Sequence, residues 1–245
     1  GLYLAGMGLG ALLHDQHPTA NLWARFFKVE IALSAVGAVA VPLLHLSHTG
    51  ALLFEVYGLT FLGKVLFFGT GFLLITTIGI LTGFELPVLI DLANTSKNKK
   101  RLTNRVLASD YTGSLLGGLA FPLILVPNLS LVAIGLIAAT LNIILAVLAL
   151  YFFVPKLHQS SFRFIVSGSL AVMLGLGLNF TLPLDRYFTK LYYFYWDQSE
   201  DFKQLFASMD NAEDVFRVRS PYQRIDLVHD KAGAEPSPIN DLYSS

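Results

Sequence analysis

Long apolar stretches separated by short polar ones make up the first three quarters of the chain. An apolar run of about 20 residues is long enough for a helix to cross the hydrocarbon layer of a membrane. Helices are expected there, because hydrocarbon offers no partner for an unpaired backbone group. The pattern predicts about six spans, the first of them partial, and one additional short or interfacial helix. The expected spans are 1–13, 26–46, 65–90, 107–126, a fifth that follows Asn128 and ends at Val154, and 164–184, and the short helix lies near 51–63.

Two of these stretches are rich in glycine, which lets helices pack closely in membranes. The glycines are Gly6, Gly8 and Gly10 in the first stretch, and Gly113, Gly117 and Gly118 in the fourth span. Proline removes a backbone donor and crowds the preceding turn. We therefore expect kinks at Pro87 and Pro122, and a tight turn at Pro127 and Asn128.

The last quarter of the chain has a different character. Seven aromatic residues between Tyr187 and Trp196 are typical of a belt at the membrane–water interface. Apolar and polar residues then alternate, which predicts one or two short strands. The expected domains are a transmembrane helical domain at 1–184, an aromatic belt and linker at 185–214, and a strand segment and tail at 215–245.

Composition supports an all-α integral membrane helix bundle with a short soluble C-terminal segment that contains one or two β-strands. Hydrophobic residues make up 54% of the chain and charged residues 14%, whereas an ordinary soluble domain is about 25% charged. The net charge of zero gives no indication of a nucleic-acid partner. The absence of cysteine excludes disulfides and thiolate metal sites. His45 and His48 share a helix face but have no further ligands nearby, so that neither a metal site nor a cofactor is predicted.

Charge also predicts an orientation. The loop at 94–105 carries five basic residues, which are Lys97, Lys99, Lys100, Arg101 and Arg105. Basic residues gather in cytoplasmic loops, so we expect a multi-pass protein of a bacterial inner membrane with this loop in the cytoplasm. The chain is apolar from its first residue and does not begin with Met, so its first span is expected to be the end of a longer one.

Four charged residues within or beside the spans are candidates for a functional role: Glu85, Asp110, Lys64 and Glu30. An ionised side chain in hydrocarbon costs at least ~2.5 kcal/mol, so such residues usually face a bundle interior, a cavity or a partner. In the plainer interpretation, Asp91 and Asp110 mark the interface and Glu85 bonds a neighbouring helix. The sequence leaves both interpretations open.

Several segments resemble a known enzyme family. They are GMGLGALL at 6–13, TGFELPVLIDL at 82–92, SDYTGSLLGGLAFPLILVPNLSL at 109–131 and SPYQRIDLVHD at 220–230. In this order they resemble the membrane region of multi-span spermidine synthases, the polyamine aminopropyltransferases, followed by the start of the catalytic domain. The resemblance implies aminopropyl transfer from decarboxylated S-adenosylmethionine to putrescine, with Gln223 beside the nucleoside thioether.

The residues that this reaction needs after Gln223 are not found. The residues after Gln223 do not form a strand, a glycine-rich turn and a helix. Such a unit takes about 30 residues. No catalytic residue is therefore predicted, and enzymatic activity stays open.

Three functions remain. The first is a non-catalytic scaffold or accessory subunit in a larger membrane complex, with the lipid bilayer and other membrane subunits as partners. The second is a membrane-anchored aminopropyltransferase of which this chain is a part, which would bind decarboxylated S-adenosylmethionine and putrescine through its catalytic domain. The third is a small transporter or channel for a polar or cationic solute, with the four charged residues along its path.

Overall fold

The computed structural model describes residues 1–17, 21–95 and 99–153, scattered positions between 167 and 188, and the strands at 216–219 and 224–227. The chain divides into two compact units, Gly1–Thr181 and Leu182–Ser245, and each is described by itself.

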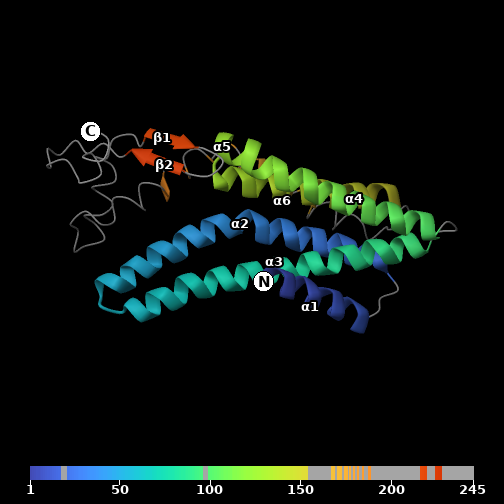
Figure 1. The fold of residues 1–245 in the computed structure, drawn as a ribbon, viewed down its shortest axis with the longest axis horizontal. Coiled ribbons are helices and arrows are strands. Elements are labelled where there is room, and N and C mark those ends of the chain that lie inside the picture. Colours follow the sequence, from blue (N-terminus) through green and yellow to red (C-terminus); the bar gives the residue numbers. More distant parts are fainter. Residues whose placement is uncertain are drawn as a thin grey trace. The chain divides into compact units, whose positions relative to one another are not determined.

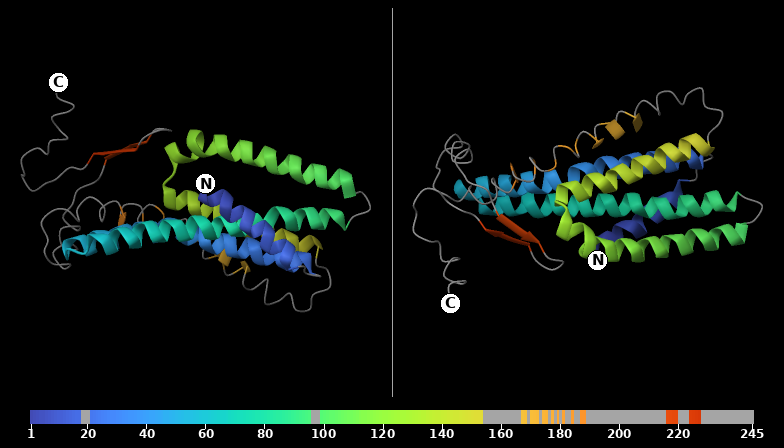
Figure 2. Two further views of the ribbon diagram at one scale, coloured as in Figure 1. Left: turned by 60° about the horizontal axis from the view of Figure 1, so that its bottom comes forward. Right: turned by 90° about the horizontal axis from the view of Figure 1, so that it is seen from above.

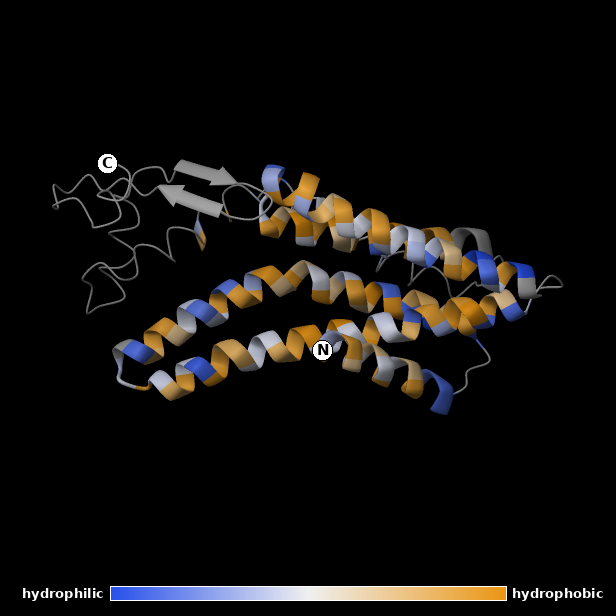
Figure 3. Cartoon of the chain, viewed as in Figure 1, coloured by the Kyte–Doolittle hydropathy of each residue, from blue (hydrophilic) through white to orange (hydrophobic). Residues whose placement is uncertain are grey.

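Long helices form the first unit (Figures 1 and 2). They are α1 (Leu2–Gln16), α2 (Leu22–Val56), α3 (Thr60–Asn94), α4 (Lys99–Ala120), the π-helical turn η1 (Phe121–Leu125), α5 (Val126–Asn128) and α6 (Leu131–Phe153). Among the described residues, four helices are long and apolar enough to cross a membrane. Figure 3 shows that hydrophobic residues predominate along these helices, with hydrophilic residues at the start of α4 and the end of α1. The prediction of a mainly helical chain with several membrane-length apolar helices is confirmed.

Helix α2 is longer than predicted. The expected separation of a span at 26–46 from a short helix at 51–63 is wrong, because one helix of 35 residues contains the whole of the first and continues into the second as far as Val56. Residues 60–63 of the expected short helix belong to α3. The polar side chains of His45 and Thr49 each bond a carbonyl one turn earlier, which satisfies them inside the helix. The break comes after Val56, where Gly58 has a φ of +74°, a left-handed conformation that glycine adopts at little cost.

The connection between α3 and α4 is shorter than the predicted loop at 94–105. Helix α3 ends at Asn94 and α4 begins at Lys99, so the basic residues from Lys99 to Arg105 are helical. Lysine and arginine are good helix formers, and a charged sequence in water is free to extend a membrane helix beyond the hydrocarbon.

Each of the three prolines with a predicted effect lies in a helical segment. Pro87 lies inside α3, which continues to Asn94. Pro122 lies in the π-helical turn η1, because a residue without an N–H cannot complete the regular bond ladder. The expected turn at Pro127 and Asn128 is displaced by one residue, since both are helical and the extended residue is Leu129. The next helix is then capped by Ser130, whose Oγ accepts a bond from the backbone N–H of Ala133 at 3.1 Å.

Helix α2 packs against both α3 and α6. Phe26 of α2, Val88 of α3 and Ala149 of α6 form one buried cluster. About two turns after Phe26 along α2, the hydroxyl of Ser34 donates to the carbonyl of Ala139 of α6 at 2.7 Å. A buried bond of this kind joins the two helices where no water can compete.

Helix α1 is held against α3 by glycines on both helices. Gly6 and Gly10 of α1 face Gly79 and Gly83 of α3, with the same four-residue spacing on each side. A Cβ atom added to Gly79 would lie 2.6 Å from a backbone oxygen of α1, and one added to Gly10 or Gly83 would overlap the facing backbone. The predicted small-residue face is therefore used at Gly6 and Gly10, whereas a Cβ built on Gly8 meets no atom of the described residues within 4 Å.

In the second unit, β1 (Phe216–Arg219) and β2 (Arg224–Leu227) pair antiparallel, with Val218 opposite Ile225. Apart from Tyr187 and Phe188, the predicted aromatic belt and linker at 185–214 lies outside the described residues, and so does Gln223. The described positions of the predicted span at 164–184 are helical, and Gly177 there contacts Leu136 of α6.

Candidate functional site

Three of the four predicted polar residues lie on adjacent helices at one depth. Glu30 on α2, Glu85 on α3 and Asp110 on α4 each lie roughly 12 to 17 Å along the helix from the end where α3 joins α4, at 1.5 Å per residue. Glu85 is close enough to interact electrostatically with both Glu30 and Asp110. The structure thus brings these carboxylates together from three helices.

The fourth residue is not part of this group. Lys64 is exposed near the start of α3, about 30 Å along that helix from Glu85. Residues 65–84 between them carry no charge, and about 20 residues are what a helix needs to cross hydrocarbon. Lys64 and Glu85 therefore mark opposite edges of the apolar layer of α3.

Glu30 has an unusual environment for a carboxylate. Its side chain is only 1% exposed, and neither carboxylate oxygen has a hydrogen-bond partner among the described residues. Glu85 is partly buried and Asp110 is exposed. Because a buried, unpaired carboxylate is costly, it is normally neutralised by a proton or a cation. Of the three carboxylates, Glu30 is therefore the one whose surroundings favour a bound proton or a bound cation.

A second polar group joins α1, α2 and α3 at the same end of the bundle. The buried His14 places its Nε2 2.9 Å from Oδ2 of the half-exposed Asp91. Arg25 places its Nη1 3.1 Å from the Nδ1 of His14 and also donates to the carbonyl of His17. Arginine can only donate, so Nδ1 accepts and Nε2 carries the proton that is donated to Asp91. The result is a directed chain of bonds from α2 through α1 to α3.

We expect Asp91→Ala to lower the free energy of unfolding by about 1 to 3 kcal/mol, because it leaves the buried Nε2–H of His14 without an acceptor. Unfolding by sodium dodecyl sulfate in mixed micelles measures this loss. Asp15→Ala is the matched control, since Asp15 is exposed on α1 and has no bond among the described residues. Equal losses in the two variants would contradict the role assigned to Asp91.

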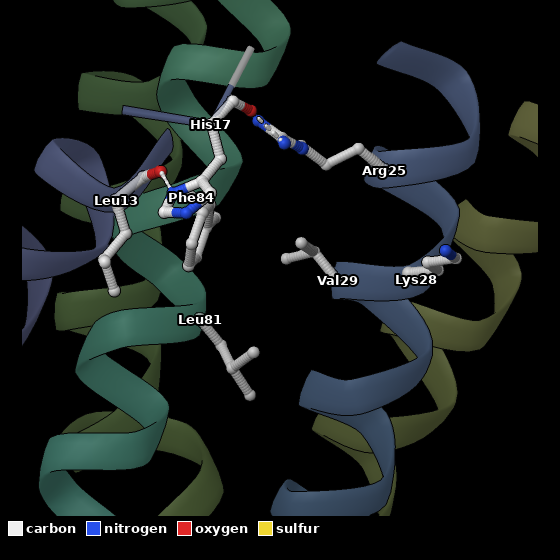
Figure 4. A pocket seen from close by; sticks show the side chains of 7 residues that line it. All are labelled: Leu13, His17, Arg25, Lys28, Val29, Leu81 and Phe84. Atoms are coloured by element: carbon white, nitrogen blue, oxygen red, sulfur yellow. Dashed lines mark hydrogen bonds between the residues drawn. The ribbon is translucent and has the colours of Figure 1, made fainter. Parts of the chain in front are cut away.

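A pocket of about 430 Å³ lies beside this chain of bonds (Figure 4). Its lining residues come from three helices: Leu13 and His17 from the α1 end, Arg25, Lys28 and Val29 from α2, and Leu81 and Phe84 from α3. Figure 4 shows the α1 and α3 residues on one side and the α2 residues on the other. The volume falls within the usual range of 300 to 1,000 Å³ for small-molecule pockets.

Both histidines of α2 have interaction partners within the helix bundle. The ring of His48 packs edge-on against Phe67 at a centroid distance of 5.5 Å, and Nδ1 of His45 bonds the carbonyl of Val41. Within the described ranges, no three histidine or carboxylate residues are arranged to hold a metal ion.

Comparison with known proteins gives the ancestry of this helical region. The chain is 32% identical over 182 residues to a polyamine aminopropyltransferase of Leptospira interrogans, and 31% identical over 186 residues to one of Oceanobacillus iheyensis. These matches cover 74% and 73% of the chain. The homologues of this chain are polyamine aminopropyltransferases. The family resemblance of the sequence motifs is thereby confirmed.

The relationship to the aminopropyltransferases includes the membrane helices. A match that covers three quarters of the chain must contain α4, α6 and most of α3. The chain spans about a third of the length of these relatives, at 33% for both. An aminopropyltransferase of Ralstonia nicotianae is 32% identical over 66% of the chain and 29% of its own length. No family model matches the chain, and no solved structure matches it.

Sequence reasoning missed two features of this site. It selected Glu30, Glu85 and Asp110 from their charge at bilayer depth, but not the bond between His14 and Asp91, which are 77 residues apart. It also missed the pocket, because Leu81 and Phe84 look like any other apolar residue of a span. The only available signal was the position of His14 and Arg25 on either side of one short polar turn.

Proposed function

We propose that this chain is the membrane domain of a polyamine aminopropyltransferase, and that it anchors aminopropyl transfer at the bilayer as a scaffold without catalytic residues of its own. One observation carries the proposal: relatives about three times longer match three quarters of the chain, and four membrane-length helices fill most of its described part. A catalytic domain that continues the same polypeptide, or a companion subunit, would supply the chemistry.

The orientation follows from the basic residues. Lys99, Lys100, Arg101 and Arg105 lie on the first two turns of α4, and a basic membrane end favours the cytoplasm. We propose a bacterial inner membrane with this end in the cytoplasm, where an aminopropyltransferase would find its nucleoside donor. Other membrane subunits would pack on α4, where Gly113, Gly117 and Gly118 have no neighbouring atom within 4 Å of a built Cβ among the described residues.

Purification of the native protein from its membrane, with its full reading frame, tests this function. We expect aminopropyl transfer from decarboxylated S-adenosylmethionine to putrescine in the membrane fraction, and none from residues 1–245 produced alone. The transfer activity should appear in one long polypeptide or in a stoichiometric complex. A native membrane preparation that contains the protein but has no transfer activity would contradict the proposal.

A transporter of a cationic solute is the second candidate. It is favoured by the buried Glu30, whose carboxylate has no hydrogen-bond partner among the described residues, and by Glu85, which interacts electrostatically with both Glu30 and Asp110. Ionisable residues of membrane spans often line ion or solute pathways. The test is uptake of labelled putrescine into proteoliposomes that contain the chain. Loss of uptake in Glu30→Gln, but not in Lys64→Gln, would support transport, whereas absence of uptake by the unchanged chain would exclude it for this solute.

A further inference from the structure

The pocket between α1, α2 and α3 changes its chemistry with depth. Leu81 and Phe84 belong to the uncharged stretch at 65–84, which lies in the hydrocarbon layer. Arg25 and Lys28 lie on the first two turns of α2, near the end of the helix. One wall of the pocket is therefore apolar at hydrocarbon depth, and its other end is cationic at the depth of the lipid headgroups.

The cationic end has bonding capacity to spare. Arg25 uses part of its guanidinium on carbonyl and ring acceptors of α1, but a guanidinium carries five N–H donors. Lys28 is exposed and makes no hydrogen bond or ion pair among the described residues. The three bonds on Arg25 fix its position, whereas Lys28 is free to turn toward a ligand.

We propose that this pocket binds one anionic phospholipid, with the phosphate at Arg25 and Lys28 and one acyl chain between Leu13, Val29, Leu81 and Phe84. Both requirements of such a lipid are met along one axis, since the apolar walls accept the chain and the basic residues attract the negative headgroup. A water-soluble anion would gain nothing from the apolar wall, and a neutral lipid would gain nothing from the two basic side chains. This site is separate from the proposed aminopropyl transfer and does not depend on it.

Native mass spectrometry of the full 245-residue chain, with phosphatidylglycerol or phosphatidylcholine of the same acyl chains, tests the proposal. We expect one phosphatidylglycerol to remain bound at concentrations where phosphatidylcholine does not. Lys28→Gln should weaken phosphatidylglycerol binding about fivefold, the effect of one basic residue near an anionic headgroup. Leu81→Trp should abolish binding, because the larger side chain fills the apolar end.

Two variants serve as matched controls. Lys64→Gln removes an exposed lysine of α3 outside the pocket, and Leu73→Trp enlarges a residue of α3 that is 68% exposed. Neither should change phosphatidylglycerol binding. Equal binding of the two lipids, equal weakening by Lys28→Gln and Lys64→Gln, or no retained lipid at all would each overturn the proposal. Lys28→Gln changes an exposed side chain, so its result remains informative if Leu81→Trp fails to fold.

Discussion

Gly10→Leu is expected to lower the free energy of unfolding by about 3 kcal/mol and to detach α1 from α3. A side chain at Gly10 would meet the backbone of α3 at Ile80 and Gly83, and overpacking of a well-packed contact costs about 1 to 3 kcal/mol. A backbone cannot rotate away as a side chain does, so we expect the upper end of this range. Unfolding in mixed micelles measures the loss.

Gly8→Leu is the matched control for this prediction. Gly8 lies on the same helix, two residues or about half a turn from Gly10, and has no atom within 4 Å of a built Cβ in the described part of the chain. We expect its stability to stay within about 0.5 kcal/mol of the original protein. If Gly8→Leu and Gly10→Leu are equally stable, the close contact of α1 with α3 is not present in the membrane.

Glu30→Met is expected to raise the free energy of unfolding by about 2 kcal/mol. The variant keeps most of the side-chain volume and removes a buried carboxylate that has no partner among the described residues. Replacement of buried ionic groups by apolar residues of similar size is often stabilising by about 1 to 4 kcal/mol. Parallel unfolding curves of the two proteins give the difference.

Glu55→Met is the control, because Glu55 is exposed at the far end of the same helix. We expect no change in its stability beyond about 0.5 kcal/mol. A loss of stability in Glu30→Met would show that Glu30 has a bonding partner in the folded protein. A gain in stability together with lost putrescine uptake would show that Glu30 is retained for function, as the transporter hypothesis requires.

The two groups of polar residues have different consequences for the bundle. His14, Arg25 and Asp91 satisfy one another and join three helices, which is what a structural bond in a membrane protein does. Glu30 is left unsatisfied among the described residues, and this costs stability. Thus the polar residues near one end of α1, α2 and α3 include both a stabilising group and a residue whose retention needs another explanation.

Some of this site could be predicted from the chain alone. Glu30, Glu85 and Asp110 were selectable because a charge at bilayer depth stands out from an apolar background. Lys64 was selected by the same rule, yet it lies at the opposite edge of the apolar layer of α3. The depth of a residue in the membrane can be calculated along its helix at 1.5 Å per residue. The sequence does not indicate whether two helices bring their charged residues together.

The amino-acid sequence determined that this protein is mainly helical, that its helices are of membrane length, and that its homologues are polyamine aminopropyltransferases. These properties follow from the length of apolar runs and from local motifs. The tertiary structure alone decided that Gly10 meets Gly83, that His14 meets Asp91 and that Glu30 is buried. The physical reason is that the apolar residues of α2 and α3 are spread around the whole circumference of each helix, so that no amphipathic stripe indicates which face turns toward a neighbouring helix.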